Sequence, residues 1–500
     1  MTRTPSARIG FDNEKYLAIQ SENIRKRISK FGGKLYLEFG GKIFDDLHAS
    51  RVLPGFEPDS KIKMLSQLKD QAEIVVAINA SDIEKNKVRG DIGITYDLEV
   101  LRLIDAFRAR GLLVSSVVLT QYTSQKAADA FCGRLTALGM KVYKHYIIPG
   151  YPSNVSFIVS DEGYGKNEHV ATERSLVVVT GPGPGSGKMA VCLSQMYHDH
   201  KKGINSGYAK FETFPMWDLP LKHPVNLAYE AATADLNDVN MIDPFHLEAY
   251  GKTAINYNRD IEVFPVLNSI LERISGSSPY RSPTDMGVNT AGQCVINDDI
   301  IKEASKQEII RRYYAARCSV KKGPGSESSV RKLESLMGEA GITQNDRKAV
   351  APVLKTAAKS GRPTVGIELR DGKIITGKAS PLMCASAAAI LNALKTLGKI
   401  DDSMHLIAPS VIEPVRNMKT NYLGNSIPGL STDEVLVALS VSAATSPAAD
   451  LALRKLPELK GCEAHSSVIL PAADESLFRQ LGVNITSEPQ YLTGDLYQKR

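Results

Sequence analysis

Short apolar runs alternate with amphipathic stretches over the first 220 residues, and this alternation limits the fold more than any other feature. The apolar runs, which predict buried strands, cover residues 34–39, 72–78, 112–120, 140–148 and 174–180. Residues 97–111 and 124–139 place apolar side chains at helical spacing, and each stretch stops at a glycine. Strands and helices that alternate are joined by right-handed crossovers. The sequence therefore predicts an α/β fold with a doubly wound, mostly parallel sheet, and two smaller α/β lobes are the alternative.

The rest of the chain indicates further domains, because 500 residues exceed what one hydrophobic core organises. Strand signals fade near residue 225, and helical periodicity follows. The stretch KKGPGSESS (321–329) has the composition of a linker, and PTVGIELRDGKIITG (363–377) predicts a hairpin that turns at Asp371-Gly372. We expect an α/β domain over 1–224, a mainly helical domain over 225–322 and a C-terminal α/β domain over 330–500.

Charge and cysteine usage narrow the class of protein. The formal net charge is only +6, and no run of five like charges occurs, so neither nucleic acid nor a membrane surface is an expected partner. The first 20 residues lack the apolar core of a signal peptide. Six scattered cysteines without a C-x-x-C pair are typical of reduced thiols. These features predict a cytoplasmic protein.

A glycine-rich segment, TGPGPGSGKMAV (180–191), follows the last of the predicted strands. A phosphate site needs backbone N–H groups that point inward, a helix N-terminus and a lysine. The segment offers all three, and the residues expected to bind phosphate are Gly181, Gly183, Gly185, Ser186, Gly187 and Lys188. This pattern predicts a site for ATP, GTP or another phosphate ligand. The alternative is a tight strand-to-helix turn whose glycines serve packing.

The spacing from Gly181 to Gly187-Lys188 resembles that of dethiobiotin-synthetase-like P-loop ATPases, which have five residues between the first glycine and G-K. Met189 stands where such loops carry the Ser or Thr that binds Mg²⁺, and a thioether is a poor ligand for a hard cation. Whether Mg²⁺ binds is therefore left open. The next predicted strand and its exit, YAKFETFPMWDLP (208–220), supply Glu212 and Asp218 as weak candidate metal ligands. Further acids that follow are Asp235, Asp238 and Asp243.

Three other segments deserve an interpretation. The polar loop SGSSPYRSPTDMGVNTAG (275–292) includes Arg281, which suits a carboxylate or phosphate, and Asp285; a solvent-exposed connector is the alternative. The triplet His198-Asp199-His200 reads as a surface helix end, because adjacent helical residues point in different directions. GGK (40–42) is either a second anion-binding turn or a plain turn.

The stretch GIELRDGKIITGKASPLMCASAAAI (366–390) resembles the zinc-dependent cytidine deaminases around their first metal ligand. Cys384 matches that ligand, but Ser386 replaces the proton-shuttling glutamate. SPAADLALRKL (446–456) resembles the helix that carries the family's P-C-x-x-C motif, but Ala448 stands at its first cysteine position, and the stretch contains no cysteine. The resemblance implies a deaminase-like topology. The replaced residues predict that this domain binds no zinc and does not catalyse deamination.

Nearly the whole chain resembles a bacterial family known as uncharacterised protein family 0371 (domain of unknown function 1846). The stretches that carry this resemblance are KLYLEFGGKIFDDLHASRVLPGF, TGPGPGSGK, YAKFETFPMWDLPL and YRSPTDMGVN. It implies a cytoplasmic α/β protein of several subdomains. It implies no activity, so the function is inferred from the residues themselves.

The residues favour a protein that binds a nucleotide or phosphorylated metabolite, most simply an ATP-dependent small-molecule enzyme of phosphotransfer or ligase type. Candidate catalytic residues are Lys188, Asp218, Arg281 and Asp285. The alternative is a nucleotide- or metabolite-sensing protein without turnover, which Met189 favours. The expected partner is a small phosphorylated molecule, and a homo-oligomer is left open.

Overall fold

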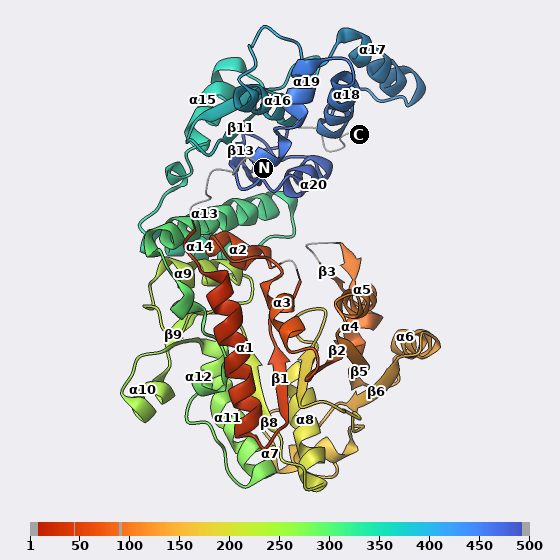
Figure 1. Ribbon diagram of the computed structural model, residues 1–500, viewed down its shortest axis with the longest axis vertical. Coiled ribbons are helices and arrows are strands. Elements are labelled where there is room, and N and C mark those ends of the chain that lie inside the picture. The colour runs from red at the N-terminus through yellow and green to blue at the C-terminus, as the bar shows by residue number, and fades with distance from the viewer. Residues whose placement is uncertain (1–8, 45, 90–92, 493–500) are drawn as a thin grey trace. The chain divides into compact units, whose positions relative to one another are not determined.

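A six-stranded sheet forms the centre of the first of two units into which the chain divides, Met1–Ser305 and Lys306–Arg500. The computed structural model describes residues 9–44, 46–89 and 93–492 (Figure 1). Every pair of neighbouring strands in this sheet is parallel, in the order β6-β5-β2-β7-β1-β8. The strands are β1 (Leu35–Phe39), β2 (Ala72–Asn79), β5 (Leu113–Tyr122), β6 (Lys141–Tyr146), β7 (Leu176–Thr180) and β8 (Gly207–Phe211). The predicted α/β class and parallel sheet are confirmed.

The strand order creates a switch in direction between β1 and β7. From β1 the chain steps to β2, β5 and β6 in one direction, through α3 (Ser60–Gln67), α5 (Tyr96–Arg108) and α6 (Lys126–Ala137). From β7 it steps through α8 (Lys188–Lys201) to β8 in the other direction. Right-handed crossovers place these two sets of helices on opposite faces of the sheet. The loops after β1 and β7 therefore diverge, and this is where open α/β sheets bind ligands.

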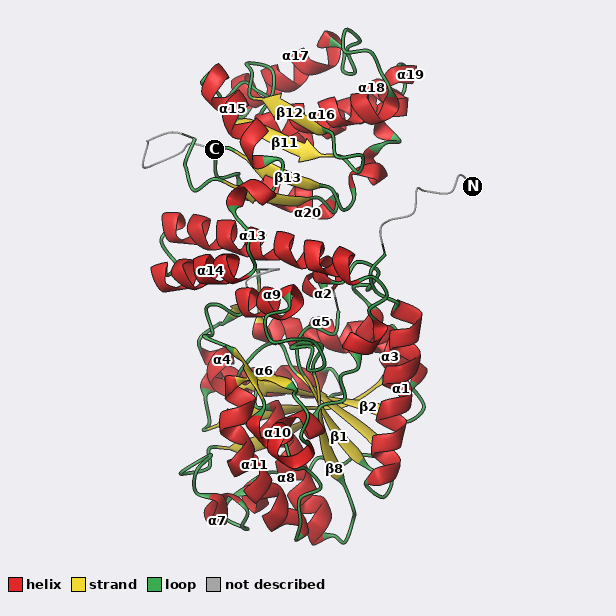
Figure 2. Ribbon diagram, turned by 90° about the vertical axis from the view of Figure 1, so that its left-hand side faces the viewer, coloured by secondary structure: helices red, strands yellow, loops and turns green. Residues whose placement is uncertain are grey.

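Figure 2 shows α1 (Asn13–Lys30) and α3 on one side of the sheet, and α8 and α11 (Asn258–Ser275) on the other. On the α8 side, Tyr36, Val177 and Val179 pack in one core with side chains of α8 and α11. The strand residues are apolar on both faces because helices cover both. Shorter elements of this unit are α2 (Leu47–Val52), α4 (Ala80–Glu84), α7 (Val155–Ile158), β3 (Val88–Arg89) and β4 (Ile94–Thr95).

The region after β8 is mainly helical, as expected, but it also contains two short strands that the sequence pattern concealed. The helices are α9 (Pro224–Ala232), α10 (Pro244–Tyr250), α11, α12 (Pro283–Met286) and α13 (Asp298–Lys322). Gly251 adopts a left-handed conformation that ends α10. The following segment β10 (Ile255–Tyr257) then pairs antiparallel with β9 (Asn240–Ile242). The helical periodicity that the sequence shows after residue 225 continues across β10, so the pattern gave no sign of this strand.

The second unit contains a mixed sheet of order β12-β11-β13-β14, in which only β13 and β14 are parallel. Its strands are β11 (Thr364–Glu368), β12 (Ile374–Lys378), β13 (Glu463–Ser466) and β14 (Asn484–Ser487). Its main helices are α14 (Glu327–Glu339), α15 (Val350–Ser360), α16 (Ala385–Gly398), α17 (Pro409–Asn417), α18 (Thr432–Ala443), α19 (Pro447–Leu453) and α20 (Ala472–Gln480). The hairpin predicted at Asp371-Gly372 is confirmed, with Gly372 at φ +83°.

Two boundaries differ from the sequence interpretation. The linker expected over 321–329 is shorter, because α13 continues to Lys322 and α14 begins at Glu327. The sequence also predicts that the hairpin leads into a helix that starts near Pro381. Helix α16 begins instead at Ala385, because the Cys384 N–H donates to the Leu430 carbonyl and holds the preceding residues in extended conformation. Within the described ranges, none of the helices combines the length and apolar character that a bilayer crossing requires.

Candidate functional site

The loop between β7 and α8 needs each of its four glycines. Gly185 and Gly187 have φ of +79° and +83°, in the left-handed region that favours glycine. At Gly181 a Cβ would lie 2.4 Å from the Ala77 carbonyl oxygen, and at Gly183 it would lie 2.3 Å from the Tyr96 hydroxyl. Gly185 itself has open space around it. The loop therefore presses against β2 and α5 at its start and opens to solvent at its middle.

Neighbouring strands hold the carbonyl groups of this loop. The Thr120 hydroxyl at the end of β5 donates to the Ser186 carbonyl oxygen at 2.9 Å. The Asn79 amide at the end of β2 donates to the Gly185 carbonyl oxygen at 3.4 Å. Within the loop, the buried Ser186 hydroxyl donates to the Gly183 carbonyl oxygen at 2.9 Å. These bonds turn carbonyl oxygens toward β2 and β5.

Several backbone N–H groups of the same segment, unlike its carbonyl groups, have no hydrogen-bond partner among the described residues. Among the described residues, none accepts a hydrogen bond from the backbone N–H of Gly185, Gly187, Lys188 or Met189. Helix α8 has Gly187 as its N-cap and therefore no side-chain cap for its first turn. Free N–H groups at an uncapped helix N-terminus form a positive end that suits an anion.

Lys188 adds a positive charge at this point. Its side chain is partly buried, and its Nζ lies 3.5 Å from the Ser186 hydroxyl. Burial and the Glu38 carboxylate raise the pKa of the Cys192 thiol, and Lys188 opposes that shift. Glu38 and Lys188 thus both act on the same buried thiol one turn into α8.

A second group of polar side chains lies at the end of β8. The Lys210 ammonium donates to both carboxylate oxygens of Asp260, at 2.8 and 2.6 Å, and to the Tyr257 hydroxyl at 2.8 Å. The same ammonium is 3.2 Å from Glu212, which also accepts a hydrogen bond from the Tyr257 hydroxyl. On the neighbouring strand, Glu38 accepts from the Tyr208 hydroxyl at 2.6 Å.

The proton affinities in this group follow from burial and charge. Burial raises the pKa of Glu212, with Asp260 acting in the same direction and Lys210 against it. For Lys210, burial acts to lower the pKa, but the Asp260 and Glu212 carboxylates outweigh it and raise the pKa well above its ordinary value. Lys210 is therefore charged at neutral pH, and the Glu212 carboxylate takes up a proton more easily than an ordinary glutamate does.

Lys210, Glu212 and Asp260 line a cavity of about 50 Å³, and the polar 280s loop also borders it. The Val288 N–H donates to the Lys210 carbonyl, so the loop runs beside β8. The lining residues are Lys210, Glu212, Phe214, Pro215, Trp217, Ile255, Asn256, Asp260, Pro283, Thr284, Gly287 and Asn289. Gly40, which directly follows β1, lies beside this wall of the cavity, because a Cβ at Gly40 would lie 2.6 Å from the Glu212 side chain.

The structure does not bring the predicted metal ligands together beside Lys188. Glu212 directly follows β8, which lies two strands from β7, and this corresponds to about 10 Å across a sheet. Asp218 is exposed and lies against Gly292. Asp238 forms an ion pair with Arg259 at 2.9 Å, and Asp243 accepts from the Thr284 hydroxyl at 2.6 Å.

The other two candidate catalytic residues, Arg281 and Asp285, both contact Tyr250. The Arg281 side chain is exposed and its guanidinium lies 5.0 Å from the ring centre of Tyr250. Asp285 closes the capping box of α12 with Ser282 and accepts from the Tyr250 hydroxyl at 2.9 Å. Of the 280s loop, it is Thr284, Gly287 and Asn289 that border the cavity.

The triplet His198-Asp199-His200 was misinterpreted as a plain surface helix end. Asp199 is fully buried and accepts from the Tyr36 hydroxyl at 2.8 Å and from the Lys34 ammonium at 3.0 Å. His169 lies 3.6 Å from the same carboxylate. The C-terminal end of α8 is fixed to the start of β1 by this ion pair, so its role is structural.

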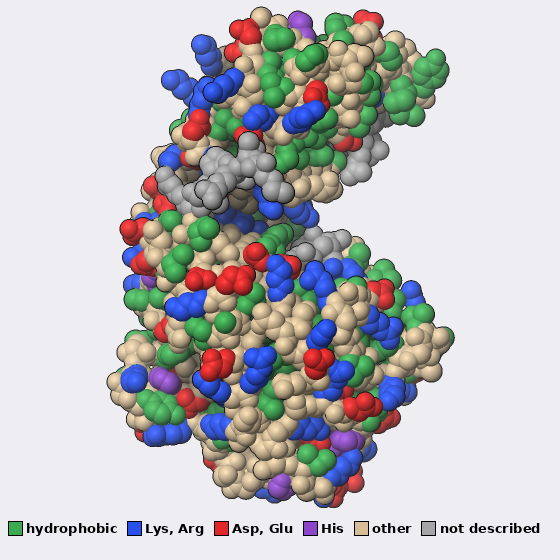
Figure 3. Space-filling view, viewed as in Figure 1, with side chains coloured by type: hydrophobic (Ala, Val, Ile, Leu, Met, Phe, Trp, Pro, Cys, Tyr) green, Lys and Arg blue, Asp and Glu red, His purple; other side chains and the backbone are tan. Residues whose placement is uncertain are grey.

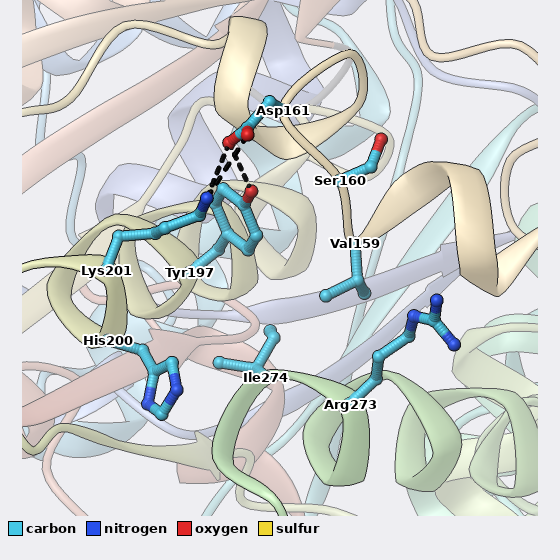
Figure 4. Close-up of a pocket in the computed structure, with 8 residues that line it drawn as sticks. All are labelled: Val159, Ser160, Asp161, Tyr197, His200, Lys201, Arg273 and Ile274. Atoms are coloured by element: carbon cyan, nitrogen blue, oxygen red, sulfur yellow. Dashed lines mark hydrogen bonds and ion pairs between the residues drawn. The ribbon is translucent and has the colours of Figure 1, made fainter.

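A larger hollow of about 490 Å³ lies at the opposite, amino-terminal edge of the sheet (Figure 4). The last turns of α8 and α11 line it, with Lys201 and Arg273 among the lining residues. Lys201 binds Asp161 at 2.9 Å, and the Tyr197 hydroxyl donates to the same carboxylate at 2.7 Å. The charges at this hollow are therefore paired. Basic and acidic side chains are also mixed over the face shown in Figure 3.

In the second unit, Cys384 is the N-cap of α16. Its Sγ lies 3.3 Å from the Thr432 hydroxyl and 3.9 Å from Asp474, and burial raises the pKa of the thiol. Ser386, two residues onward, is buried. Across the described residues, no three His, Cys, Asp or Glu side chains converge as metal ligands would.

Four residues at the carboxyl edge of the sheet escaped the sequence interpretation: Glu38, Lys210, Tyr257 and Asp260. Glu38 and Lys210 interrupt otherwise apolar strands, KLYLEF and YAKF, at their second-to-last positions. A charged residue at the end of a buried strand is a usable signal, because burial of an unpaired charge is costly. Tyr257 and Asp260 gave no such signal, since they come from a segment taken as helix.

The comparisons with known proteins agree with the resemblance. Residues 9–341 match the family model "Domain of unknown function DUF1846, N-terminal", and residues 345–497 match "Domain of unknown function DUF1846, C-terminal". A UPF0371 protein of Streptococcus pyogenes serotype M5 is 57% identical over 491 residues, which cover 98% of this chain and 99% of the relative. A UPF0371 protein of Streptococcus equi subsp. equi is 55% identical over 490 residues, with the same coverage. The chain belongs to the UPF0371 (DUF1846) family.

Proposed function

We propose that the segment Gly181–Lys188 binds the phosphate groups of a nucleotide, and that the protein is an ATP-dependent enzyme acting on a small molecule. One observation carries the phosphate site: neighbouring side chains hold the carbonyl groups of the loop, while the N–H groups at the start of α8 have no acceptor among the described residues. Such an arrangement stabilises an anion through several amides and the helix dipole. Lys188 supplies the full positive charge.

The second polar group supports an enzyme. Lys210, Tyr257 and Glu212 form a hydrogen-bonded chain at the same edge of the sheet, about two strands from the loop. Because Glu212 has a raised pKa and a tyrosine as partner, it is suited to accept a proton from a substrate. The loop would hold the nucleotide, and the 280s side would hold the second substrate.

The alternative, a sensor without turnover, rests on the missing magnesium ligand. Met189 offers no hydroxyl, and Glu212 lies about two strands from the loop. A sensor of this kind would bind nucleotide equally well with and without Mg²⁺.

Replacing Lys188 with alanine should weaken ATP binding about 10- to 150-fold, since a charge-assisted hydrogen bond contributes roughly 1.5–3 kcal/mol. Calorimetric titration with ATP, GTP and inorganic phosphate measures the change. Lys201→Ala, at the far end of the same helix, is the matched control and should bind as the wild type does. Equal affinity of wild type and Lys188→Ala would remove the phosphate site.

The variant Met189→Thr separates enzyme from sensor. If another group already holds Mg²⁺ for catalysis, ATP affinity of the wild type should depend on Mg²⁺ from the start. If the ATP affinity of the wild type does not change with Mg²⁺, and that of Met189→Thr does, the result supports a sensor without turnover. Both measurements use the titration described for Lys188→Ala, with and without a chelator.

A further inference from the structure

We propose that the cavity beside Lys210 receives the ammonium group of an organic amine. This goes beyond nucleotide binding, and it is tested without any nucleotide. The charged side chains in the cavity wall are two carboxylates, Glu212 and Asp260, and one ammonium, Lys210. Its wall therefore carries excess negative charge, which an additional cation would balance.

The carboxylates are accessible to a ligand from solvent. Their side chains retain 26% and 21% of their exposure at Glu212 and Asp260, whereas Lys210 retains 16%. Both carboxylates contact Lys210, and Glu212 also accepts from the Tyr257 hydroxyl. A carboxylate offers about four acceptor positions, so capacity for a second cation is left. Glu38 lies behind them and adds to the negative potential that acts on Lys210.

The walls suit an organic cation. Phe214 and Trp217 line the cavity beside the carboxylates. The Trp217 indole N–H already donates to the Asn289 carbonyl at 2.8 Å, which leaves the apolar and π surface of the ring for contact. Aromatic rings attract ammonium groups through their quadrupole, and they pack against the attached methylene groups.

Size and ligand geometry favour an amine over a metal ion. A volume of about 50 Å³ holds about three to five water molecules, or an ammonium group with one or two methylene groups. In the part of the chain that is described, no set of three acidic, His or Cys groups is arranged as metal ligands. An ammonium needs only separate acceptors at hydrogen-bonding distance, and it tolerates the aromatic wall.

The chain carries its own reporter for this site. Trp217 is the only tryptophan among the 500 residues and lines the cavity, so intrinsic tryptophan fluorescence reports on it directly. The wild-type protein would be titrated with methylammonium and ethylammonium chloride, with ethanol as the neutral probe and sodium chloride at equal ionic strength. Saturable changes in emission with the two ammonium salts, and none with ethanol or sodium chloride, are expected.

Two variants that preserve side-chain shape test the charges. Asp260→Asn and Glu212→Gln should each weaken methylammonium binding about 10-fold or more, because each removes one charge-assisted contact. Asp235→Asn removes an exposed acid outside the cavity wall and should leave the affinity unchanged. Circular dichroism checks folding, and Glu212→Gln alone suffices if Asp260→Asn does not fold.

Three outcomes would overturn the proposal. These are a flat titration with the wild type, an equal response to potassium or magnesium, and unchanged affinity in a folded Glu212→Gln variant. None of them bears on the Lys188→Ala result, because the phosphate loop is two strands away.

Discussion

Asparagine at position 199 should lower the free energy of unfolding of the first unit by about 3–5 kcal/mol, the range typical of a broken buried ion pair. The Asp199 carboxylate is fully buried between Lys34, Tyr36 and His169. Asparagine keeps the size but loses the charge, so Lys34 is left without its counter-ion in a mostly buried position. Guanidinium denaturation followed by Trp217 fluorescence measures the change, because Trp217 lies in the first unit.

Asp161→Asn is the matched control, because Asp161 contacts Lys201 and Tyr197 at the same end of α8. Asp161 is exposed and binds Lys201 at the surface, where water screens the pair. Its replacement should leave the denaturation midpoint almost unchanged. If Asp199→Asn also left the midpoint unchanged, the ion pair with Lys34 would contribute nothing to stability, and the anchoring of α8 to β1 would need another explanation.

Sequence periodicity was sufficient for the sheet but not for this ion pair. The apolar runs LVVV and EIVVAI identified β7 and β2, because strands covered on both faces read as continuous apolar stretches. Asp199 looked exposed because it lies between two histidines near a helix end. Only the packing of α8 on β1 brings Lys34 and Tyr36 close to Asp199, which they precede by 165 and 163 positions in the sequence.

The same limit applies to the candidate site. The glycine loop could be recognised from sequence because all its parts are consecutive, from Gly181 to Lys188. Lys210, Tyr257 and Asp260 are brought together by the strand order and by the short β9–β10 pair, neither of which has a local sequence signal. Gly251, which ends α10 in a left-handed conformation, was the one residue that could have revealed the break before β10.

Acidification should destabilise the first unit through His145, by about 3 kcal/mol between pH 6.5 and 4. His145 on β6 is 3% exposed, and its Nε2 lies 3.1 Å from the Glu168 carbonyl oxygen. Burial lowers its pKa to about 4 from the ordinary value of 6.5. Between these two pKa values the imidazole is protonated in the unfolded chain but neutral in the folded chain, so a fall in pH favours the unfolded state. The stabilisation is therefore complete above pH 6.5 and is lost as the pH falls toward 4.

The measurement is the free energy of unfolding as a function of pH, again by Trp217 fluorescence. His145→Gln removes the titrating group, so the variant should lose about 3 kcal/mol less than the wild type between pH 6.5 and 4, whatever its stability at neutral pH. The exposed His200, replaced by glutamine, should leave the slope as in the wild type. Carboxylates with lowered pKa, such as Asp199, titrate below this window and do not account for the difference. Parallel curves for wild type and His145→Gln would mean that the imidazole is protonated as easily in the folded chain as in the unfolded one.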